Sequence, residues 1–213
     1  LGLEERVMSL YEKYILPRVL NCACGSKPIK YQREKVVPKA AGIVLEVGIG
    51  SGLNIPFYDS SKIDKIVGLD PSCELNVMAE KVAREHAIDI EFVLSSAEDI
   101  PLPDNHFDTV LVTYTMCTIP DAVAANKEMR RVLKPEGRLI FCEHGVAPDL
   151  KVSKWQHRID PYWTKIAGGC HLNRNIPDLI RSAGFQIQSM EEMYLPSTPK
   201  FAGYNYWGIA SYD

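Results

Sequence analysis

The sequence predicts an α/β fold: a doubly wound, mostly parallel sheet of seven strands that ends in an antiparallel hairpin. Short apolar, β-branched runs alternate with helical stretches along most of the chain, which is typical of βαβ units. The last two runs have no helix between them, which favours a hairpin. Because 213 residues with 46% hydrophobic composition can fill one core and no linker interrupts them, we expect a single domain, 1–213.

The N-terminal segment, 1–41, is expected to form helices that lie over the functional site. Apolar residues recur at helical spacing from Leu3 to Ile15, and a second helix is expected over about 29–40. We interpret the basic residues in and near this second helix as a solvated face; they are Lys27, Lys30, Arg33 and Lys35.

Five strands are expected next, over 42–48, 65–70, 90–95, 107–114 and 137–144. Two helices lie between them, and each begins at a residue type that caps helices well. The first covers 72–87 with Ser72 as its N-cap, and the second covers 121–134 with Asp121 in that position.

The segment 145–174 is predicted to be a lid-like insertion after the fifth strand, because it is long for a connector and rich in aromatic residues. An aromatic helix packed on the core is the alternative interpretation for Trp155 and Trp163. A helix over 175–185 follows, and the hairpin strands are expected over 185–195 and 204–213.

Charge and cysteine content exclude several classes of protein. A net charge of −3 and a pI near 6.0 offer no general attraction to a polyanion, so no nucleic-acid partner is expected. No apolar run is long enough to span a membrane, and membrane contact is not indicated. The acidic start lacks a basic signal-peptide region, and a chain that begins with Leu1 is compatible with a natural leader before it. The cysteines show neither disulfide nor zinc-finger spacing, which favours a cytoplasmic setting and no metal site; they lie at 22, 24, 73, 117, 142 and 170.

The stretch LEVGIGSG, 45–52, carries the strongest functional signal. Gly48, Gly50 and Gly52 follow a predicted strand, so backbone can approach a bound adenosine closely, as in dinucleotide sites. The third glycine falls one residue earlier than in the dinucleotide pattern, and Glu46 would repel phosphates. This combination favours a cofactor with a cationic centre and no phosphate, a description that fits S-adenosylmethionine.

Acidic residues after the next two strands agree with an adenosine site. Asp70 ends the second strand, where a carboxylate accepts both ribose hydroxyl protons, and we expect it to face solvent. The polar turn over 95–99 follows the third strand and would rim the adenine, with Glu98 or a backbone amide taking the exocyclic amine.

From Leu45 to Glu143 the sequence resembles the class I S-adenosylmethionine-dependent methyltransferases, through Glu-x-Gly-x-Gly-x-Gly joined to AEDIPLPDNHFDTV. The resemblance implies a Rossmann-like fold and S-adenosylmethionine as cofactor. It also implies a set of cofactor-binding residues: Glu46, Gly48, Gly50 and Gly52 for the methionine end, Asp70 and Pro71 for the ribose, Ala97 and Glu98 for the adenine, and Thr113 near the methyl group.

A methyl acceptor should bind beyond the carboxyl ends of the strands, near 114–117 and near Glu143 and His144. A neutral His144 could accept a proton near pH 7, or it could only order its loop. Cys117 is a candidate nucleophile or, more simply, a small buried hydrophobic residue.

Between Tyr11 and Phe185 the sequence is similar to the alkyl thiol methyltransferases, whose bacterial relatives are often labelled phosphatidylethanolamine methyltransferases. The similarity is carried by EH, WQ, DP-W, GC-L-R and AGF in that order. It implies roles for His144, Asp160, Cys170 and Arg174. Those proteins carry an N-terminal membrane-anchoring stretch that this sequence does not show, so membrane residence is not carried over.

We therefore expect methyl transfer to a small, fairly apolar molecule. A thiol is favoured as acceptor because a few per cent of it is thiolate at pH 7, whereas an ammonium group needs a nearby carboxylate or stronger desolvation to lose its proton. N-methylation of a phospholipid ethanolamine, a non-catalytic S-adenosylmethionine-binding module and a nicotinamide oxidoreductase remain as alternatives. The pattern leaves the oligomeric state open.

Overall fold

A mixed seven-stranded sheet forms the centre of the computed structural model, which describes residues 23–212. The order of the strands is β3-β2-β1-β4-β5-β7-β6. Their bounds are β1 Gly42–Val47, β2 Ile63–Leu69, β3 Ile90–Val93, β4 Phe107–Thr113, β5 Leu133–His144, β6 Gln186–Tyr194 and β7 Tyr204–Ser211. This arrangement confirms the predicted Rossmann-like α/β fold.

The five strands β1 to β5 run parallel, and the C-terminal pair is antiparallel. The predicted hairpin does not simply extend the sheet in chain order. The last strand, β7, pairs with β5, with Glu143 opposite Tyr206, and β6 then takes the edge. The functional positions that follow β1, β2, β4 and β5 therefore all lie at the carboxyl ends of the parallel strands.

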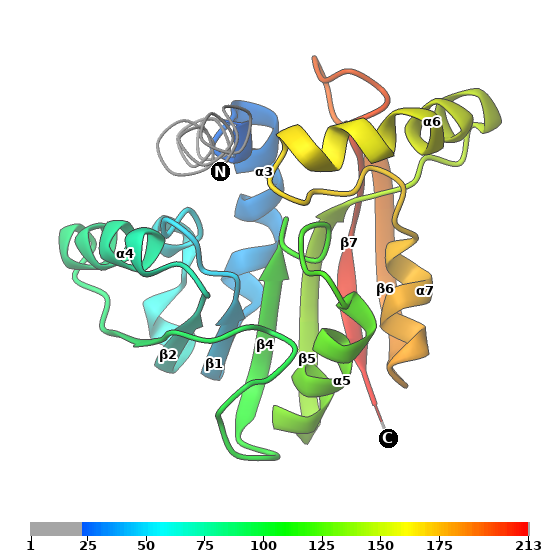
Figure 1. Cartoon of the computed structure of the whole chain (residues 1–213). Helices are drawn as coiled ribbons and strands as arrows, with labels where there is room; N and C mark the ends of the chain where they lie inside the picture. Colours follow the sequence, from blue (N-terminus) through cyan, green and yellow to red (C-terminus); the bar gives the residue numbers. More distant parts are fainter. Residues whose placement is uncertain (1–22, 213) are drawn as a thin grey trace, which may run out of the picture.

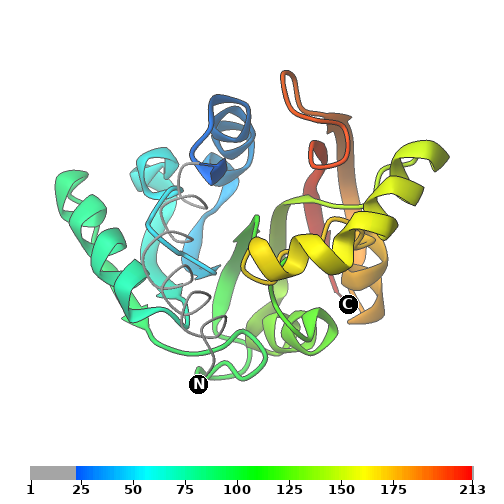
Figure 2. The ribbon, with the colours of Figure 1, turned by 45° about the horizontal axis from the view of Figure 1, so that its top comes forward.

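Helices cover both faces of the sheet, as Figures 1 and 2 show. Residues of α3 and α4 share one buried cluster with β1 and β2, and residues of α5 and α7 share another with β4 and β5. Among the described residues the longest helix is α6, and it lies over the carboxyl end of the sheet (Figure 1). The helix bounds are α3 Lys27–Val36, α4 Cys73–Glu85, α5 Ala122–Val132, α6 Leu150–Ile166 and α7 Ile176–Ser182.

Both predicted helix caps are confirmed. The side chain of Ser72 accepts a hydrogen bond from the Leu75 amide, and that of Asp121 accepts from the Val123 and Ala124 amides. Several boundaries differ from the prediction by a few residues. At the end of α5 the cause is the sheet: the helix ends at Val132 because Leu133 already pairs with Phe107.

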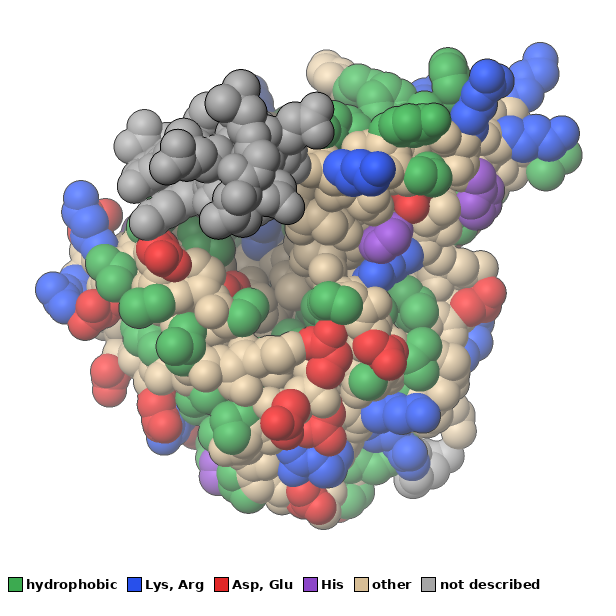
Figure 3. Space-filling model, viewed as in Figure 1, with side chains coloured by type: hydrophobic (Ala, Val, Ile, Leu, Met, Phe, Trp, Pro, Cys, Tyr) green, Lys and Arg blue, Asp and Glu red, His purple; other side chains and the backbone are tan. Residues whose placement is uncertain are grey.

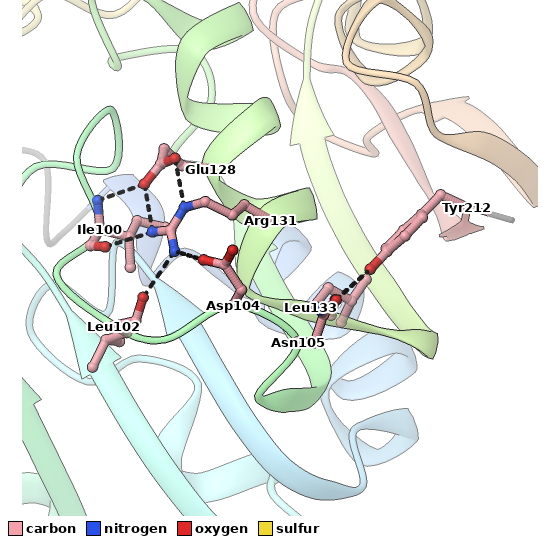
Figure 4. A network of polar contacts seen from close by, with 8 residues as sticks. All are labelled: Ile100, Leu102, Asp104, Asn105, Glu128, Arg131, Leu133 and Tyr212. Atoms are coloured by element: carbon pink, nitrogen blue, oxygen red, sulfur yellow. Dashed lines mark hydrogen bonds and ion pairs between the residues drawn. The ribbon is translucent and has the colours of Figure 1, made fainter.

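A polar network closes the loop between β3 and β4 against α5 (Figure 4). The guanidinium of Arg131 binds Glu128 on its own helix and Asp104 in the loop, and it donates to the Ile100 and Leu102 carbonyls. Because the Arg131 side chain donates hydrogen bonds to both of these carbonyls, it holds the loop that leads into β4 in place.

The segment after β5 forms the helix α6, and the interpretation of Trp155 as a core residue is wrong. Trp155 is 57% exposed, whereas Trp163 packs edge-on against Phe201 with ring centroids 6.0 Å apart. The anchor of the helix is polar: buried Gln156 donates to the Gly145 and Phe201 carbonyls and accepts from the Ala147 amide. One glutamine thus fixes the start of α6 to the end of β5.

Within residues 23–212, no helix is long and apolar enough to cross a membrane. The helix expected from Leu3 to Ile15 lies outside the described residues. The single domain over 1–213 and the covering role of 1–41 stay predictions.

Candidate functional site

The glycine turn after β1 is folded back over the end of β2. The amides of Gly48 and Ile49 both donate to the Leu69 carbonyl, at 2.7 and 3.2 Å. Gly48, Gly50 and Gly52 have φ values of +71°, +55° and +82°, which favour glycine. At Gly50 a Cβ would meet nothing closer than 3.9 Å, so this side of the turn is open to a ligand.

Asp70 lies against the glycine turn and does not face solvent, so that expectation is wrong. Its side chain is 7% exposed, and its carboxylate accepts from the amides of Gly50, at 3.0 Å, and Ser72, at 2.9 Å. The reason is the fold of the turn, which brings the Gly50 amide to the end of β2. Burial raises the pKa of Asp70 above its ordinary value. The carboxylate thus joins the turn to Ser72, the N-cap of α4, and Pro71 lies between these two residues in the sequence.

Glu46 lies in the buried second half of β1, and both of its carboxylate oxygens accept hydrogen bonds from other side chains. Its two carboxylate oxygens accept from the Asn54 amide group, at 2.9 Å, and the Tyr58 hydroxyl, at 2.6 Å. Burial raises the pKa of Glu46 to about 7, although both hydrogen bonds oppose this rise. Glu46 therefore acts from beneath the turn.

Arg33 on α3 completes this buried network, and its interpretation as part of a solvated face is wrong. Arg33 is 5% exposed, and its Nη1 donates at 2.6 Å both to Asn54 Oδ1 and to Thr113 Oγ1. Asn54 also donates to Thr113 at 2.9 Å. The guanidinium stacks over the Tyr114 ring, and its Nε is buried without a partner among the described residues. One cation thereby connects α3 to the ends of β1 and β4.

The residues expected at the adenine lie in the turn after β3. The Ala97 side chain belongs to the buried core. The Glu98 carboxylate binds the Asp121 amide and the Ser96 hydroxyl, and these hydrogen bonds lower the pKa of Glu98 although partial burial opposes them. The turn is thus fixed to the start of α5 and borders the same strand edge as Asp70.

The surface is hollowed between the side that carries α4 and the side that carries α6 (Figure 3). A cavity of about 590 Å³ lies beside the glycine turn. Among the described residues its lining comprises Cys24, Gly25, Lys30, Arg33, Ser51, Gly52, Leu53, Pro56, Phe57, Met78, Lys81, Val82 and Glu85. Asp70 and His144 do not line it, so the cavity belongs to the α3 side of the turn.

At the end of β5, Glu143 holds the turn that follows β4. Its Oε1 accepts from the Thr115 and Met116 amides, at 2.8 and 3.1 Å, and its Oε2 is buried without a partner in the described part of the chain. Burial raises the pKa of Glu143 to about 7. Tyr114, just before this turn, has a φ of +54°, which is uncommon for a bulky residue.

His144 faces two cysteines that come from distant parts of the chain. Its Nε2 lies 3.2 Å from Cys170 Sγ, and buried Cys117 lies beside them. Hydrogen bonds, first from Cys117 and then from His144, hold the pKa of Cys170 well below its ordinary value. Burial alone would lower the pKa of His144, but the hydrogen bond to Cys170, together with the negative charges of Cys170 and Glu143, outweighs burial, so the pKa is raised.

Asp160 and Arg174 hold the segment that carries Cys170. The Asp160 carboxylate accepts from the Leu172 amide at 2.7 Å and binds His171 Nδ1 at 2.8 Å. Arg174 donates to the carbonyls of Met116 and Ile119. Asp160 therefore fixes the loop after α6 to α6 itself, and Arg174 fixes the same loop to the turn after β4.

Comparison with known proteins identifies the family. Residues 45–141 match the family described as "Methyltransferase domain". The thiol S-methyltransferase TMT1B of Rattus norvegicus is 30% identical over 167 residues, which cover 75% of this chain and 68% of the relative. The chain belongs to the S-adenosylmethionine-dependent methyltransferases.

Two further comparisons, one with a curated protein and one with a solved structure, also match methyltransferases. A demethylmenaquinone methyltransferase of Bacillus licheniformis is 33% identical over 148 residues, which cover 66% of this chain and 63% of that protein. The solved structure of an S-adenosylmethionine-dependent methyltransferase from Methanosarcina mazei has a TM-score of 0.67 at 23% identity, with 82% and 93% of the two chains covered. That likeness shows the fold alone. S-adenosylmethionine is the methyl donor, which confirms the expected cofactor and enzyme class.

Sequence reasoning missed the polar residues beneath the methyltransferase's glycine turn. Arg33 belongs to a helix with several exposed lysines, and nothing in that composition distinguishes it from them. Asn54 and Tyr58 follow the glycines in a stretch with no regular period. The one usable signal was Glu46 itself, because a carboxylate within an apolar strand needs buried donors.

Alanine at Gly50 and at Gly52 should separate binding from stability. Both positions have positive φ, which costs an alanine about 1 to 2 kcal/mol. At Gly52 a Cβ would also lie 2.7 Å from Ile55 Cδ1 and 3.1 Å from Ala79 Cα. We expect Gly52→Ala to lower the melting temperature more, and Gly50→Ala to weaken S-adenosylmethionine binding by at least about tenfold in calorimetry. Unchanged binding in Gly50→Ala would show that the open side of the turn does not meet the cofactor.

Glu143→Gln should flatten the pH dependence of stability. A carboxyl group whose pKa is about 7 in the folded protein holds a proton that the unfolded chain releases near pH 4.5. Its stabilising contribution is therefore complete below about pH 4.5 and is lost as pH rises through about 7, by up to about 3 kcal/mol. Urea unfolding of Glu143→Gln should show a smaller loss between pH 5 and pH 8 than the wild type. The exposed substitution Glu136→Gln on the same strand is the control, and an equal loss in all three proteins would contradict the assignment.

Proposed function

We propose that this methyltransferase transfers the methyl group to the sulfur of a small, apolar thiol. The observation that carries the proposal is the state of the two acids at the acceptor end. Glu143 is fully buried and Asp160 is 6% exposed, so an ammonium group in the open part of the site would not reach either carboxylate. A thiol needs no such carboxylate as a base, because its own pKa is near 8.5. The name thiol S-methyltransferase among the relatives supports the same choice.

The residues around the glycine turn fit S-adenosylmethionine. The open side of Gly50 would let the cofactor approach the backbone, and Asp70 would exchange its contact with the Gly50 amide for the ribose hydroxyls. Pro71 would border the ribose, and Ala97 and Glu98 the adenine. Bound S-adenosylmethionine supplies an electrophilic methyl group on a sulfonium.

Arg33 adds a charge that suits the amino-acid end of this cofactor. Its guanidinium is buried beside Asn54 and Thr113, and its Nε has no partner among residues 23–212. A carboxylate that reached this edge would gain a charged hydrogen bond in a site shielded from water. Glu46 would act indirectly, because it orients Asn54 and Tyr58 and bears on the cofactor only through them.

At the acceptor end, His144 is the group that favours a thiolate. It lies at the end of β5, and its positive charge would lower the free energy of an anionic sulfur nearby. Asp160 and Arg174 would act as positioning residues, because they bind the loop after α6 and the turn after β4 rather than open space. The small-molecule acceptor, the absence of a nucleic-acid partner and the cytoplasmic location stay predictions.

Release of S-adenosylhomocysteine over a panel of acceptors tests this function. We expect turnover of apolar alkyl thiols and none of the alcohols of matched length, because only the thiol is appreciably ionised near neutral pH. Across thiols of different pKa, kcat/KM should rise with pH towards the pKa of each acceptor.

Vesicles that contain phosphatidylethanolamine belong in the same panel. Turnover of these head groups with no turnover of any thiol would overturn the proposal in favour of lipid N-methylation. Calorimetric binding of S-adenosylmethionine without product from any acceptor would instead indicate a binding module.

A further inference from the structure

Three soft metal-ligating groups meet at the acceptor end of the site. Cys117 Sγ, His144 Nε2 and Cys170 Sγ all lie within 4.8 Å of one another. They come from the turn after β4, the end of β5 and the loop after α6, so they are far apart in the sequence. Spacing rules for zinc sites look for pairs a few residues apart and do not detect such a group.

The three atoms lie close enough together for one zinc ion to contact them all. Zinc bonds of about 2.3 Å to sulfur and about 2.0 Å to nitrogen place tetrahedral ligand atoms roughly 3.5 to 4 Å apart. His144 Nε2 and Cys170 Sγ are 3.2 Å apart, and no pair of the three atoms is more than 4.8 Å apart. His144 presents Nε2 to the sulfurs, while Nδ1 is buried without a partner among the described residues and is left to carry the proton.

The backbone around the three ligands is fixed by other contacts. The Cys117 carbonyl accepts from the His171 amide at 2.8 Å, and His144 is paired with Asn205 in the sheet. Asp160 holds the loop after α6 to that helix, and Arg174 holds it to the turn after β4. A site of this kind is preorganised, because few torsions remain to be ordered when an ion binds.

We propose that Cys117, His144 and Cys170 bind one zinc ion and leave its fourth position open. Two thiolates and an imidazole suit zinc, and three protein ligands with an open position are typical of catalytic rather than structural zinc sites. No fourth histidine, cysteine or carboxylate of the described residues joins the group. His144 then acts on the acceptor through the ion, which supplies the positive charge.

The open position extends the proposed function, on which this part of the inference rests. A thiol acceptor would bind there as its thiolate and release its proton to solvent. In the transfer, an electron pair of the acceptor sulfur forms the bond to the methyl carbon. The bond from that carbon to the sulfonium sulfur breaks, and its electron pair stays on that sulfur.

Metal analysis of the full chain tests the site without relying on activity. After purification without chelators and incubation with zinc alone, we expect about one zinc ion per chain in the wild type and in Cys73→Ser, an exposed-cysteine control on α4. Cys117→Ser and Cys170→Ser should each retain less than about a tenth of that. A wild type that binds no zinc, or equal zinc in all four proteins, would overturn the proposal.

Cobalt replacement keeps the test decisive if a serine variant fails to fold. The wild type loaded with cobalt should show thiolate-to-metal charge-transfer absorption, and an alkyl thiol should shift the visible bands by taking the fourth position. Absence of the charge-transfer absorption would count against the ligand set. Loss of thiol turnover with zinc still bound would refute only the proposed function, whereas thiol turnover by protein that binds no zinc would refute only the metal site.

Discussion

The position of β1 between β2 and β4 is the constraint on which the site depends. The chain reverses its order across the sheet at this strand, so the segments after β1 and β4 leave in different directions and open a crevice. Parallel pairing brings the ends of all these strands to one edge. The glycine turn, Asp70 and Thr113 meet there because the sheet aligns them, and the bonds from Gly48 and Ile49 to Leu69 hold the turn over that edge.

Beneath this end of the sheet the fold buries two opposite charges, the guanidinium of Arg33 and the carboxylate of Glu46. Glu46 and Arg33 lie on different elements and are linked through Asn54, so removal of either would leave the other buried without the opposite charge near it. Such a network adds less stability than an apolar core would, because both charges must lose water. The network instead fixes the position of α3 on the sheet and places a cation beside the glycine turn.

The sequence predicted the features that depend on local pattern and missed those that depend on distant contacts. The alternation of strands and helices, the Ser72 and Asp121 caps and the glycine turn are each encoded within a few residues. The buried Asp70, the Arg33 contact with Thr113 and the meeting of Cys117 with His144 and Cys170 arise only when the sheet brings separate segments together. No periodicity signals these contacts, and the lysine-rich composition of α3 gives no sign that Arg33 is buried.

The central claim is that S-adenosylmethionine binds across the glycine turn with its ribose on Asp70. Calorimetric titration of Asp70→Asn tests it most directly, because asparagine can still accept from the Gly50 amide but loses the charged hydrogen bonds to the ribose. Asp64→Asn, an exposed change at the other end of the same strand, is the matched control. We predict that affinity falls by at least about tenfold, or about 1.4 kcal/mol, in Asp70→Asn and stays unchanged in the control. Equal affinity in the two variants would contradict the account.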